Sequence, residues 1–397
     1  KLQKDVIEAE VEVIRLMGAE FRYGVEVGRD VTLDELRAQG FKAFYVAIGC
    51  QGGRLAGIPG EDAEDVTVAV DFLREVNSGK IDALPGRTIV VGGGNVAIDV
   101  ARNACRLGSE HVEMFCLESE AQMPASEEER REAIEDGAHI SCGWGPKEIH
   151  LDEAGRVCGI TFKRCTRVFD DEGRFAPEYD ENDLRRVDAD RVVMSIGQSI
   201  VWGDLLAGSK VELGRGQGAL ADPQTYQTAE PDIFVGGDVY TGPSFAIDAI
   251  AAGHEAAVSI HRFVQPGSTL TIGRNQRRYT ALDRDDVVIE SYDNASREVA
   301  HVDREREKAA PFSEYVETFT EEQVRAETAR CLGCGASIVD PNKCIGCGLC
   351  TTKCAFDAIH LDRDRPECST MVKYEQKLPS LGKYALKRAI KIKFGKK

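Results

Sequence analysis

The sequence predicts an α/β protein with parallel sheets, followed by a small cysteine-rich domain of α+β structure. Three observations indicate this fold class. Short apolar strands alternate with amphipathic helices between residues 44 and 264, which is typical of parallel sheets. A glycine-rich turn joins one of these strands directly to a helix. Seven of the 13 cysteines fall within the 38 residues from 331 to 368, which indicates a metal centre.

Composition excludes several classes of protein. The chain has 397 residues, 42% hydrophobic and 29% charged, so it can form cores and is long enough for two or three domains. The net charge of −17 argues against nucleic acid as the main partner. No apolar run reaches the ~20 residues that span a bilayer, and no secretory signal precedes the first helix. The other six cysteines are scattered singly, as buried thiols in a reducing compartment are, so we expect a cytoplasmic protein.

Residues 1–61 are expected to form helix, strand, helix and strand. The first helix covers residues 5–17 and ends at Gly18, because glycine tolerates the left-handed conformation after a helix. Thr32–Glu35 has the residues of a capping box, which predicts a second short helix. Phe44–Gly49 is then a buried strand that ends in glycine.

Residues 62–198 are expected to form a second α/β unit, with antiparallel strands at 138–169. Residues 199–266 return to a strand followed by a long helix. The predicted elements, in order, are helix 67–77, strand Thr88–Val91, helix Val96–Leu107, strand His111–Leu117, a helix capped by Ser126, strand Arg191–Gly197, strand Ile233–Val235 and a helix from Ser244 to about Val264. Three segments complete the chain: a polar connector at 267–325, the cysteine-rich domain at 326–370, and a basic tail at 371–397 that forms either an amphipathic helix or a solvated end.

The glycine turn indicates a dinucleotide site. Gly92, Gly93, Gly94, Asn95 and Ala97 belong to a G-x-G-x-x-A sequence between a strand and a helix. The first glycine makes the tight turn, the third residue lets the backbone approach a pyrophosphate, and the alanine allows close packing of helix and strand. The helix N-terminus attracts the negative charge. The alternative is an ordinary tight turn.

The end of the next strand indicates which nucleotide binds. Glu118 follows Gly92 by 26 residues, where an acid accepts hydrogen bonds from the ribose and repels a 2′-phosphate. The following turn, Ser119–Gln122, contains no Arg or Lys. The sequence therefore favours NAD(H) over NADP(H), the alternative being a solvated glutamate at a strand end.

The cysteine spacing predicts an iron–sulfur site. Cys344, Cys347, Cys350 and Cys354 have the C-x₂-C-x₂-C-x₃-C spacing of ferredoxins, rather than that of a zinc knuckle, the alternative. Ala355 stands where bacterial ferredoxins usually have proline. Cys331 and Cys334 could begin a second site, but two 4Fe-4S clusters need eight thiolates and this region has seven. One cluster is predicted, and the count of one or two stays open.

Several motifs in order resemble the flavoproteins of the glutamate-synthase small-subunit type, a module also found at the electron-input end of dihydropyrimidine dehydrogenase. They are Lys4-Asp-Val6, Ile58-Pro-Gly-Glu-Asp62, Met123-Pro-Ala125, Ile196-Gly-Gln198, Val235–Ser244 and Ala246–Gly253. The resemblance covers about two thirds of the chain. It implies an FAD domain interrupted by an NAD(P) domain, with crossings near 59–62 and 196–198. The ferredoxin-like 4Fe-4S domain that follows in the sequence is predicted from its cysteine spacing alone.

The resemblance also implies FAD-binding residues. Gly237 and Asp238 would hold the ribityl chain or pyrophosphate, although Asp238 could instead cap a helix. The helix beginning with Ala246 and Ile247 would point at the flavin, and Gly197 would lie at the domain crossing. The chain departs from the family in two places. Its NADPH-binding members carry arginines near the position of Glu118, and their FAD domain needs a first βαβ unit with a glycine fingerprint. None precedes Lys1, where the chain begins without methionine, so we expect the later part of a longer polypeptide.

The combined expectation is an NADH-dependent electron-transfer flavoprotein. Hydride would pass from NADH to FAD, and single electrons would leave through the 4Fe-4S site to a protein acceptor, either ferredoxin or a multisubunit reductase. No catalytic side chain is predicted, because the cofactors carry the chemistry. The alternatives are an electron-input subunit of the glutamate-synthase type and a non-catalytic iron–sulfur wire or assembly subunit. Residues 1–330 contain no C-x₂-C or C-x₄-C pair, which excludes a disulfide reductase.

Overall fold

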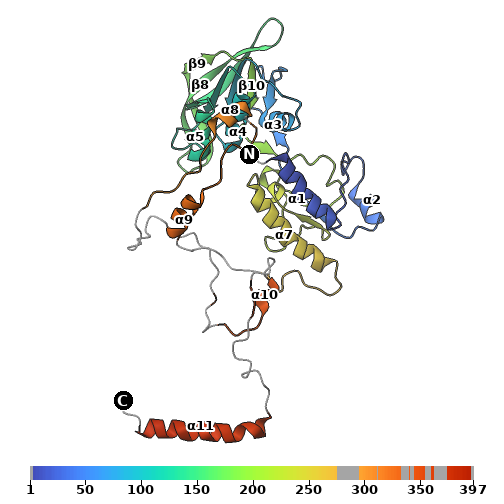
Figure 1. Cartoon of the computed structure of the whole chain (residues 1–397). Coiled ribbons are helices and arrows are strands. Elements are labelled where there is room, and N and C mark those ends of the chain that lie inside the picture. The colour runs from blue at the N-terminus through green and yellow to red at the C-terminus, as the bar shows by residue number, and fades with distance from the viewer. Residues whose placement is uncertain are drawn as a thin grey trace. The chain divides into compact units, whose positions relative to one another are not determined.

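The computed structural model describes residues 3–274, 295–310, 312–331, 339, 344–353, 359–361 and 373–394. The chain divides into two compact units (Figure 1). The first contains residues 1–289 and 300–318, and the second contains residues 290–299 and 319–397.

The largest sheet of the first unit has five parallel strands, which confirms the predicted α/β class. In spatial order they are β3 (Val66–Val68), β10 (Arg191–Met194), β4 (Arg87–Val91), β5 (His111–Cys116) and β6 (His139–Cys142). Buried alanine and valine side chains of the helices pack against one face of the sheet. The helices are α3 (Ala69–Asn77), α4 (Asn95–Arg106) and α5 (Glu127–Glu135).

The strand β6 corrects one expectation. Residues 138–169 were expected to be antiparallel, but β6 pairs in parallel with β5. The reason is that α5 lies between the two strands and forms a crossover, which brings the chain back in the same direction. The expected helix at 67–77 also begins two residues later, because Val66–Val68 is the edge strand β3.

A three-stranded antiparallel sheet covers the other face of the parallel sheet. It consists of β7 (Trp144–Leu151), β8 (Val157–Phe169) and β9 (Phe175–Val187). The two sheets meet in a fully apolar layer. At its centre the rings of Phe115 and Phe162 stack with their centroids 3.9 Å apart, and neither ring is exposed. This layer fixes the floor of the cavity described below.

A separate small sheet joins segments that are far apart in the sequence. Strand β1 (Phe44–Val46) pairs in parallel with β12 (Ile233–Val235). Nearby, β2 (Gly52–Gly53) pairs antiparallel with β11 (Gln198–Ser199), so the two stretches that connect this part of the unit to the five-stranded sheet lie side by side.

The helices around this small sheet begin and end largely where the sequence predicts. Helix α1 (Lys4–Leu16) is followed by Met17 and Gly18, and Gly18 has a φ of +103°. Helix α2 (Leu33–Ala38) begins with the predicted capping box. The strand expected between α1 and α2 is reduced to an isolated bridge between Val27 and Val31. The remaining helices are α6 (Asp238–Thr241), which was not predicted, and α7 (Ala246–Phe263), which was.

The segment read as a connector contains ordered structure. Residues 304–309 form α8 (Arg304–Ala309), and the polar sequence around it gave no apolar period to reveal it. This helix and the residues after it contact the rest of the first unit through polar groups instead: Arg304 of α8 donates to Glu135 at 2.9 Å, and Arg106 donates to the hydroxyl of Tyr315, which follows α8, at 2.7 Å. The guanidinium of Arg106 also lies 5.3 Å from the centre of the Tyr315 ring.

The second unit contains three described helices. They are α9 (Glu321–Ala329), α10 (Leu349–Lys353) and α11 (Tyr374–Phe394). Helix α9 overlaps the end of the expected connector at 267–325, which is a further correction. The basic tail forms the helix α11, and all of its described side chains are exposed, so the tail is both helical and solvated. Among the described helices, none has the length and apolar character that a bilayer crossing requires.

One pH-dependent contribution to stability comes from the amino ends of β4 and β10, two neighbouring interior strands of the five-stranded sheet. The side chain of Arg87 donates to Asp190 at 2.9 Å and holds the pKa of that carboxyl at about 2, against the opposing effect of partial burial. A carboxyl with a lowered pKa stabilises the fold above its ordinary pKa near 4, and this contribution disappears as the pH falls toward 2. Half of the Asp190 side chain is exposed, so solvent screening limits the effect.

We therefore expect Asp190→Asn to lower the free energy of unfolding by about 1 kcal/mol at pH 7. The difference from the parent chain should shrink as the pH falls from 4 toward 2, because the unfolded parent takes up its proton near pH 4 while the folded carboxyl stays ionised until about pH 2. Urea unfolding at a series of pH values measures it. A deficit that stays constant down to pH 2 would contradict an electrostatic origin.

Candidate nucleotide and iron–sulfur sites

The glycine turn lies between β4 and α4, as its sequence predicts. Gly92 has a φ of +144°, a conformation that side chains rarely adopt. A Cβ atom on Gly92 would lie 2.2 Å from the carbonyl oxygen of Ser195, which follows the neighbouring strand β10. The N–H of Gly92 donates to the carbonyl of Phe115 at 2.8 Å. The first glycine of the motif therefore lets the chain turn tightly between two strands.

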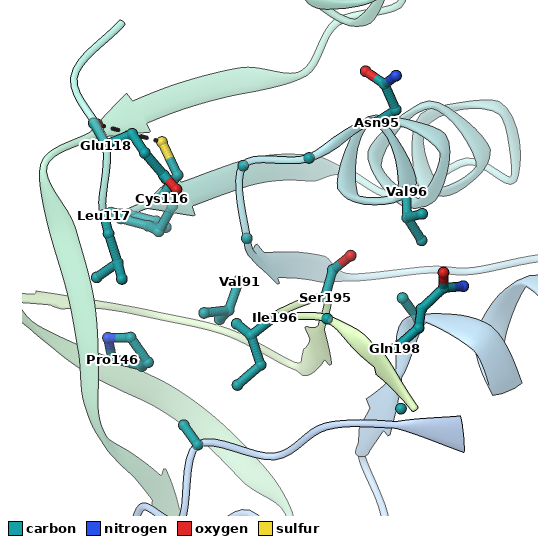
Figure 2. A pocket seen from close by; sticks show the side chains of 18 of the residues that line it. Val91, Asn95, Val96, Cys116, Leu117, Glu118, Pro146, Ser195, Ile196 and Gln198 are labelled. Atoms are coloured by element: carbon teal, nitrogen blue, oxygen red, sulfur yellow. Dashed lines mark hydrogen bonds between the residues drawn. The ribbon is translucent and has the colours of Figure 1, made fainter. Parts of the chain in front are cut away.

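The rest of the turn opens onto a cavity of about 1030 Å³ (Figure 2). Gly94 caps helix α4, and a Cβ atom at this position would meet nothing within 4 Å. Gly93 and Asn95 also line the cavity. Ala97 is fully buried against the core, as expected for the residue that lets helix and strand pack closely. The first N–H groups of a helix lack partners within it, so the end of α4 presents donors to this space.

Glu118 lies beside the turn. It lies two residues after the end of β5, and a Cβ atom on Gly93 would lie 3.0 Å from its Oε2 atom. The backbone of Glu118 is held by the N–H of Gly143, which donates to its carbonyl at 2.9 Å. Figure 2 shows Glu118 and Leu117 at the edge of the cavity, next to the turn that leads into α4. The structure thus brings the predicted ribose-binding acid and the predicted pyrophosphate turn together.

The structure also places a cation, Arg130, at the turn that follows Glu118. The sequence reasoning missed this residue. Arg130 comes from α5, and its Nη1 atom donates to the carbonyl of Glu120 at 2.7 Å. Its Nε atom is buried without a hydrogen-bond partner in the described part of the chain. The position of α5 is fixed by Ser126, whose N–H donates to Asn95 at 3.1 Å. The prediction considered only the turn after Glu118, so a cation brought there by the next helix escaped it.

The far wall of the cavity comes from the antiparallel sheet, which no motif marks. Trp144, Lys163 and Tyr179 line it. The ammonium of Lys163 lies 4.1 Å from the centre of the Tyr179 ring and donates to Glu181 at 2.7 Å. This hydrogen bond lowers the pKa of Glu181. Only tertiary structure reveals these residues, because β8 and β9 reach the cavity by pairing across a long hairpin.

The residues predicted to bind FAD fall into two groups. Gly197 lines the cavity, as do Pro243, Ser244 and Phe245 before α7. Gly237 and Asp238 are not among its lining residues and lie at the carboxyl end of β12. A Cβ atom on Gly49, after β1, would be 4.0 Å from the Asp238 carboxylate.

The carboxyl ends of β1 and β12 therefore meet at Asp238, which is where ligands bind to open parallel sheets. The Asp238 carboxylate accepts the N–H of Ser244 at 3.2 Å. Ala246 and Ile247 open α7, and both are exposed, Ile247 to 67%. They line neither the cavity nor a core cluster of the described residues.

The loop before α10 carries three of the predicted iron–sulfur ligands. Cys344, Cys347 and Cys350 are exposed and free. Gly346 has a φ of +65°, and its N–H donates to the sulfur of Cys344 at 3.4 Å. Three cysteines on one loop, one of which accepts a backbone N–H, have the ligand chemistry that an iron–sulfur cluster requires.

The ligand set is not gathered in the described residues. Cys331 is exposed directly after α9, whereas Cys334 and Cys354 lie outside the residues that the structure describes. Across the described residues, no group of three or more Cys, His, Asp or Glu side chains is arranged to hold a metal ion. The assignment of Cys344, Cys347 and Cys350 therefore depends on their spacing and on the loop conformation.

Comparison with known proteins agrees with these sites. Residues 3–253 match the pyridine nucleotide-disulphide oxidoreductase family, and residues 337–360 match a 4Fe-4S binding domain. The chain is 32% identical to the NADP(+)-dependent formate dehydrogenase subunit beta of Moorella thermoacetica, over 84% of this chain and 48% of that protein. It is also 32% identical to the glutamate synthase [NADPH] small chain of Escherichia coli, over 67% of this chain and 59% of that protein. The chain thus spans about half the length of these relatives.

A solved structure shows the same fold. Mycobacterium tuberculosis FprA in complex with NADPH superposes with a TM-score of 0.52 at 20% identity, covering 65% of this chain and 72% of that one. The resemblance seen in the sequence motifs is therefore confirmed. The chain belongs to the pyridine nucleotide-disulphide oxidoreductase family of FAD- and NAD(P)-binding oxidoreductases, and it carries a 4Fe-4S binding domain C-terminal to this region in the sequence.

Proposed function

We propose that this chain is the electron-input part of a cytoplasmic NADH-dependent oxidoreductase that contains FAD and a 4Fe-4S cluster and delivers electrons to a protein acceptor. One observation carries the proposal: the glycine turn and Glu118 face the same 1030 Å³ cavity. The N–H groups at the start of α4 would bind the pyrophosphate. Glu118 would accept hydrogen bonds from the adenosine ribose. The second unit would provide the route to the acceptor, either ferredoxin or a multisubunit reductase.

The residues at the small sheet fit an FAD. Gly237 has a φ of +66° and lets the backbone turn closely at the end of β12, where Asp238 faces the end of β1. Ser244 and Phe245 extend from there to the nucleotide cavity, so ligands in the two places could approach each other. A bound flavin supplies the capacity to take a hydride and release single electrons. Gly237, Asp238 and the residues before α7 would orient it.

The cysteine loop fits a 4Fe-4S cluster by its donor set. We assign Cys344, Cys347, Cys350 and Cys354 as ligands, with Cys331 and Cys334 as candidates for a second cluster. The N–H of Gly346 would stabilise charge on the sulfur atoms, as it does for Cys344. Iron and flavin content per chain, measured on anaerobically purified protein, tests both assignments. About four irons indicate one cluster and about eight indicate two, and absence of iron would overturn the proposal.

The preference for NADH is the most specific part of the proposal. It differs from the two relatives above, which are named for NADP(+) and NADPH. Glu118 would repel a 2′-phosphate, and Arg130 is occupied by the carbonyl of Glu120. Anaerobic titration with NADH and NADPH, followed by calorimetry, measures the preference. Tighter binding of NADPH would refute it.

Removing the acid should reverse this preference. We expect Glu118→Ala to weaken NADH binding about tenfold, through loss of a charged hydrogen bond to the ribose. NADPH binding should strengthen about tenfold, because one nearby negative charge is removed. Calorimetric dissociation constants measure both changes. Glu120→Ala is the matched control, since the exposed Glu120 side chain is removed while the carbonyl that binds Arg130 remains. Equal effects of the two substitutions would contradict a specific role for Glu118.

A further inference from the structure

Two cysteines that are far apart in the sequence meet beside the nucleotide turn. Cys116 ends β5 and Cys142 ends β6, and the two residues are direct partners in the parallel ladder. Their sulfur atoms lie 3.7 Å apart, and both are free thiols. Neighbouring strands are about 4.8 Å apart, which lies within the range of Cα separations found in disulfides, roughly 4.4–6.8 Å. The backbone is thus already placed for a bond between them.

This pair is in direct contact with the candidate nucleotide site. Cys116 lines the cavity, and a Cβ atom on Gly93 would lie 2.9 Å from its Cβ atom. The Cys116 thiol donates to the carbonyl of Glu118 at 3.7 Å, the interaction drawn in Figure 2. The same carbonyl accepts the N–H of Gly143, the residue after Cys142. The carbonyl of Glu118 is therefore held by Cys116 itself and by the residue that follows Cys142.

We propose that Cys116 and Cys142 form a reversible disulfide when the protein meets a peroxide, and that this bond weakens nucleotide binding at the adjacent turn. The bond itself depends only on the geometry of the two strands. The effect on binding rests on the proposed function, because it requires that a nicotinamide nucleotide occupies the cavity.

The two thiols have different surroundings, which indicates the order of the steps. Cys116 is 2% exposed, and burial raises the pKa of its thiol, with the nearby sulfur of Cys142 adding to the effect. Cys142 is only partly buried. Because the thiolate is the reactive form and must be reached by the oxidant, Cys142 is the group that meets peroxide first and Cys116 is the group that resolves the product.

The chemistry balances with one peroxide per pair. The Cys142 sulfur attacks one peroxide oxygen, the O–O bond breaks, and the products are a sulfenic acid on Cys142 and one water. The Cys116 sulfur then attacks the sulfenic sulfur, the S–O bond breaks, and the hydroxide that leaves takes the Cys116 proton to give a second water. Two thiols lose two electrons, which reduce one H₂O₂ to two waters. A dithiol reductant reverses the bond by thiol–disulfide exchange.

The bond would disturb the site through Glu118. The two sulfur atoms must approach from 3.7 Å to about 2.05 Å, which draws the Cys116 sulfur toward β6. The carbonyl of Glu118 then loses the S–H donor. The contact between the Cys116 side chain and Gly93 also changes. We expect the dissociation constant for NADH to rise about tenfold.

Peptide mapping of the full-length chain tests the bond. Anaerobically purified protein is treated with stoichiometric H₂O₂, alkylated, and digested without reductant, and mass spectrometry is used to find the peptides that contain residues 116 and 142. The expected result is one crosslinked pair that dithiothreitol releases. Recovery of both cysteines as alkylated monomers, under peroxide that modifies other cysteines of the chain, would overturn the proposal.

Two variants separate the bond from its effect. Cys142→Ser should give no crosslink and should keep its NADH affinity after peroxide. Cys158→Ser is the matched control on β8, where no hydrogen bond joins Cys158 to another sulfur in the described chain, and it should behave like the parent. A crosslink that leaves NADH affinity unchanged would overturn the effect on binding. Failure of the reduced protein to bind NADH would instead refute the proposed function, while the peptide map still decides whether the bond forms.

Discussion

Gly92→Ala is expected to abolish nucleotide binding and to destabilise the first unit by about 3 kcal/mol. Two costs combine. The φ of +144° at Gly92 is strained for any residue with a Cβ atom, at about 1–3 kcal/mol. The new methyl group would also lie 2.2 Å from the carbonyl oxygen of Ser195, and backbone atoms can relieve such an overlap only by moving β4 away from β10, at a further cost of about 1–3 kcal/mol.

The measurement is thermal unfolding together with NADH calorimetry. For a unit of this size, with an unfolding entropy of about 2.1 cal/mol/K per residue, a loss of 3 kcal/mol lowers Tm by about 5 °C. Gly94→Ala is the matched control two residues later. Gly94 has a φ of −89°, and its new methyl group would meet nothing within 4 Å. We expect it to leave Tm unchanged and to weaken NADH binding, because the methyl group occupies the space beside the pyrophosphate. An unchanged Tm for Gly92→Ala would contradict the tight-turn role.

The contrast between these two glycines shows how far the sequence determines the site. The G-x-G-x-x-A spacing predicted both the tight turn at Gly92 and the open side of the turn at Gly94. It could do so because each residue of the motif meets a local conformational requirement. Glu118 was predictable for the same reason: the end of the second strand always lies beside the turn in this arrangement. Caps such as the one at Thr32 follow equally local rules and were found at the predicted residues.

The features that sequence reasoning missed are those created by pairing between distant segments. Arg130 reaches the Glu118 turn from the following helix. Lys163 and Tyr179 reach the cavity from strands β8 and β9. Cys116 and Cys142, which seemed isolated, meet because β6 is parallel to β5. The strand residues among them have no local signature, since a one-residue change in strand register would move each side chain to the other face of its sheet.

The docking of α8 illustrates the same limit and leads to a second large effect. The segment from 300 to 318 lacks the apolar period that marks an amphipathic helix, yet it contacts the first unit through a buried polar cluster. Arg102 is at its centre, with 8% of its side chain exposed. Its Nε atom donates to Asp136 at 2.7 Å, and it also bonds Glu132 and the Tyr315 hydroxyl. Burial lowers the pKa of Arg102, but the hydrogen bond and attraction from Asp136 raise it above its ordinary value.

We expect Arg102→Ala to lower the free energy of unfolding by about 3 kcal/mol, the lower end of the cost of breaking a buried ion pair. The Asp136 side chain is only 6% exposed, so removing the guanidinium leaves a buried carboxylate that Arg106 alone neutralises, through contacts of 3.1 and 3.3 Å. Urea unfolding at pH 7 measures the change. Arg131→Ala is the control, because its pair with Glu135 spans 3.9 Å and its side chain is 65% exposed; such a pair contributes at most about 0.5 kcal/mol. Similar losses for the two variants would show that burial of the cluster contributes nothing, and that surface charge alone holds the segment from 300 to 318 in place.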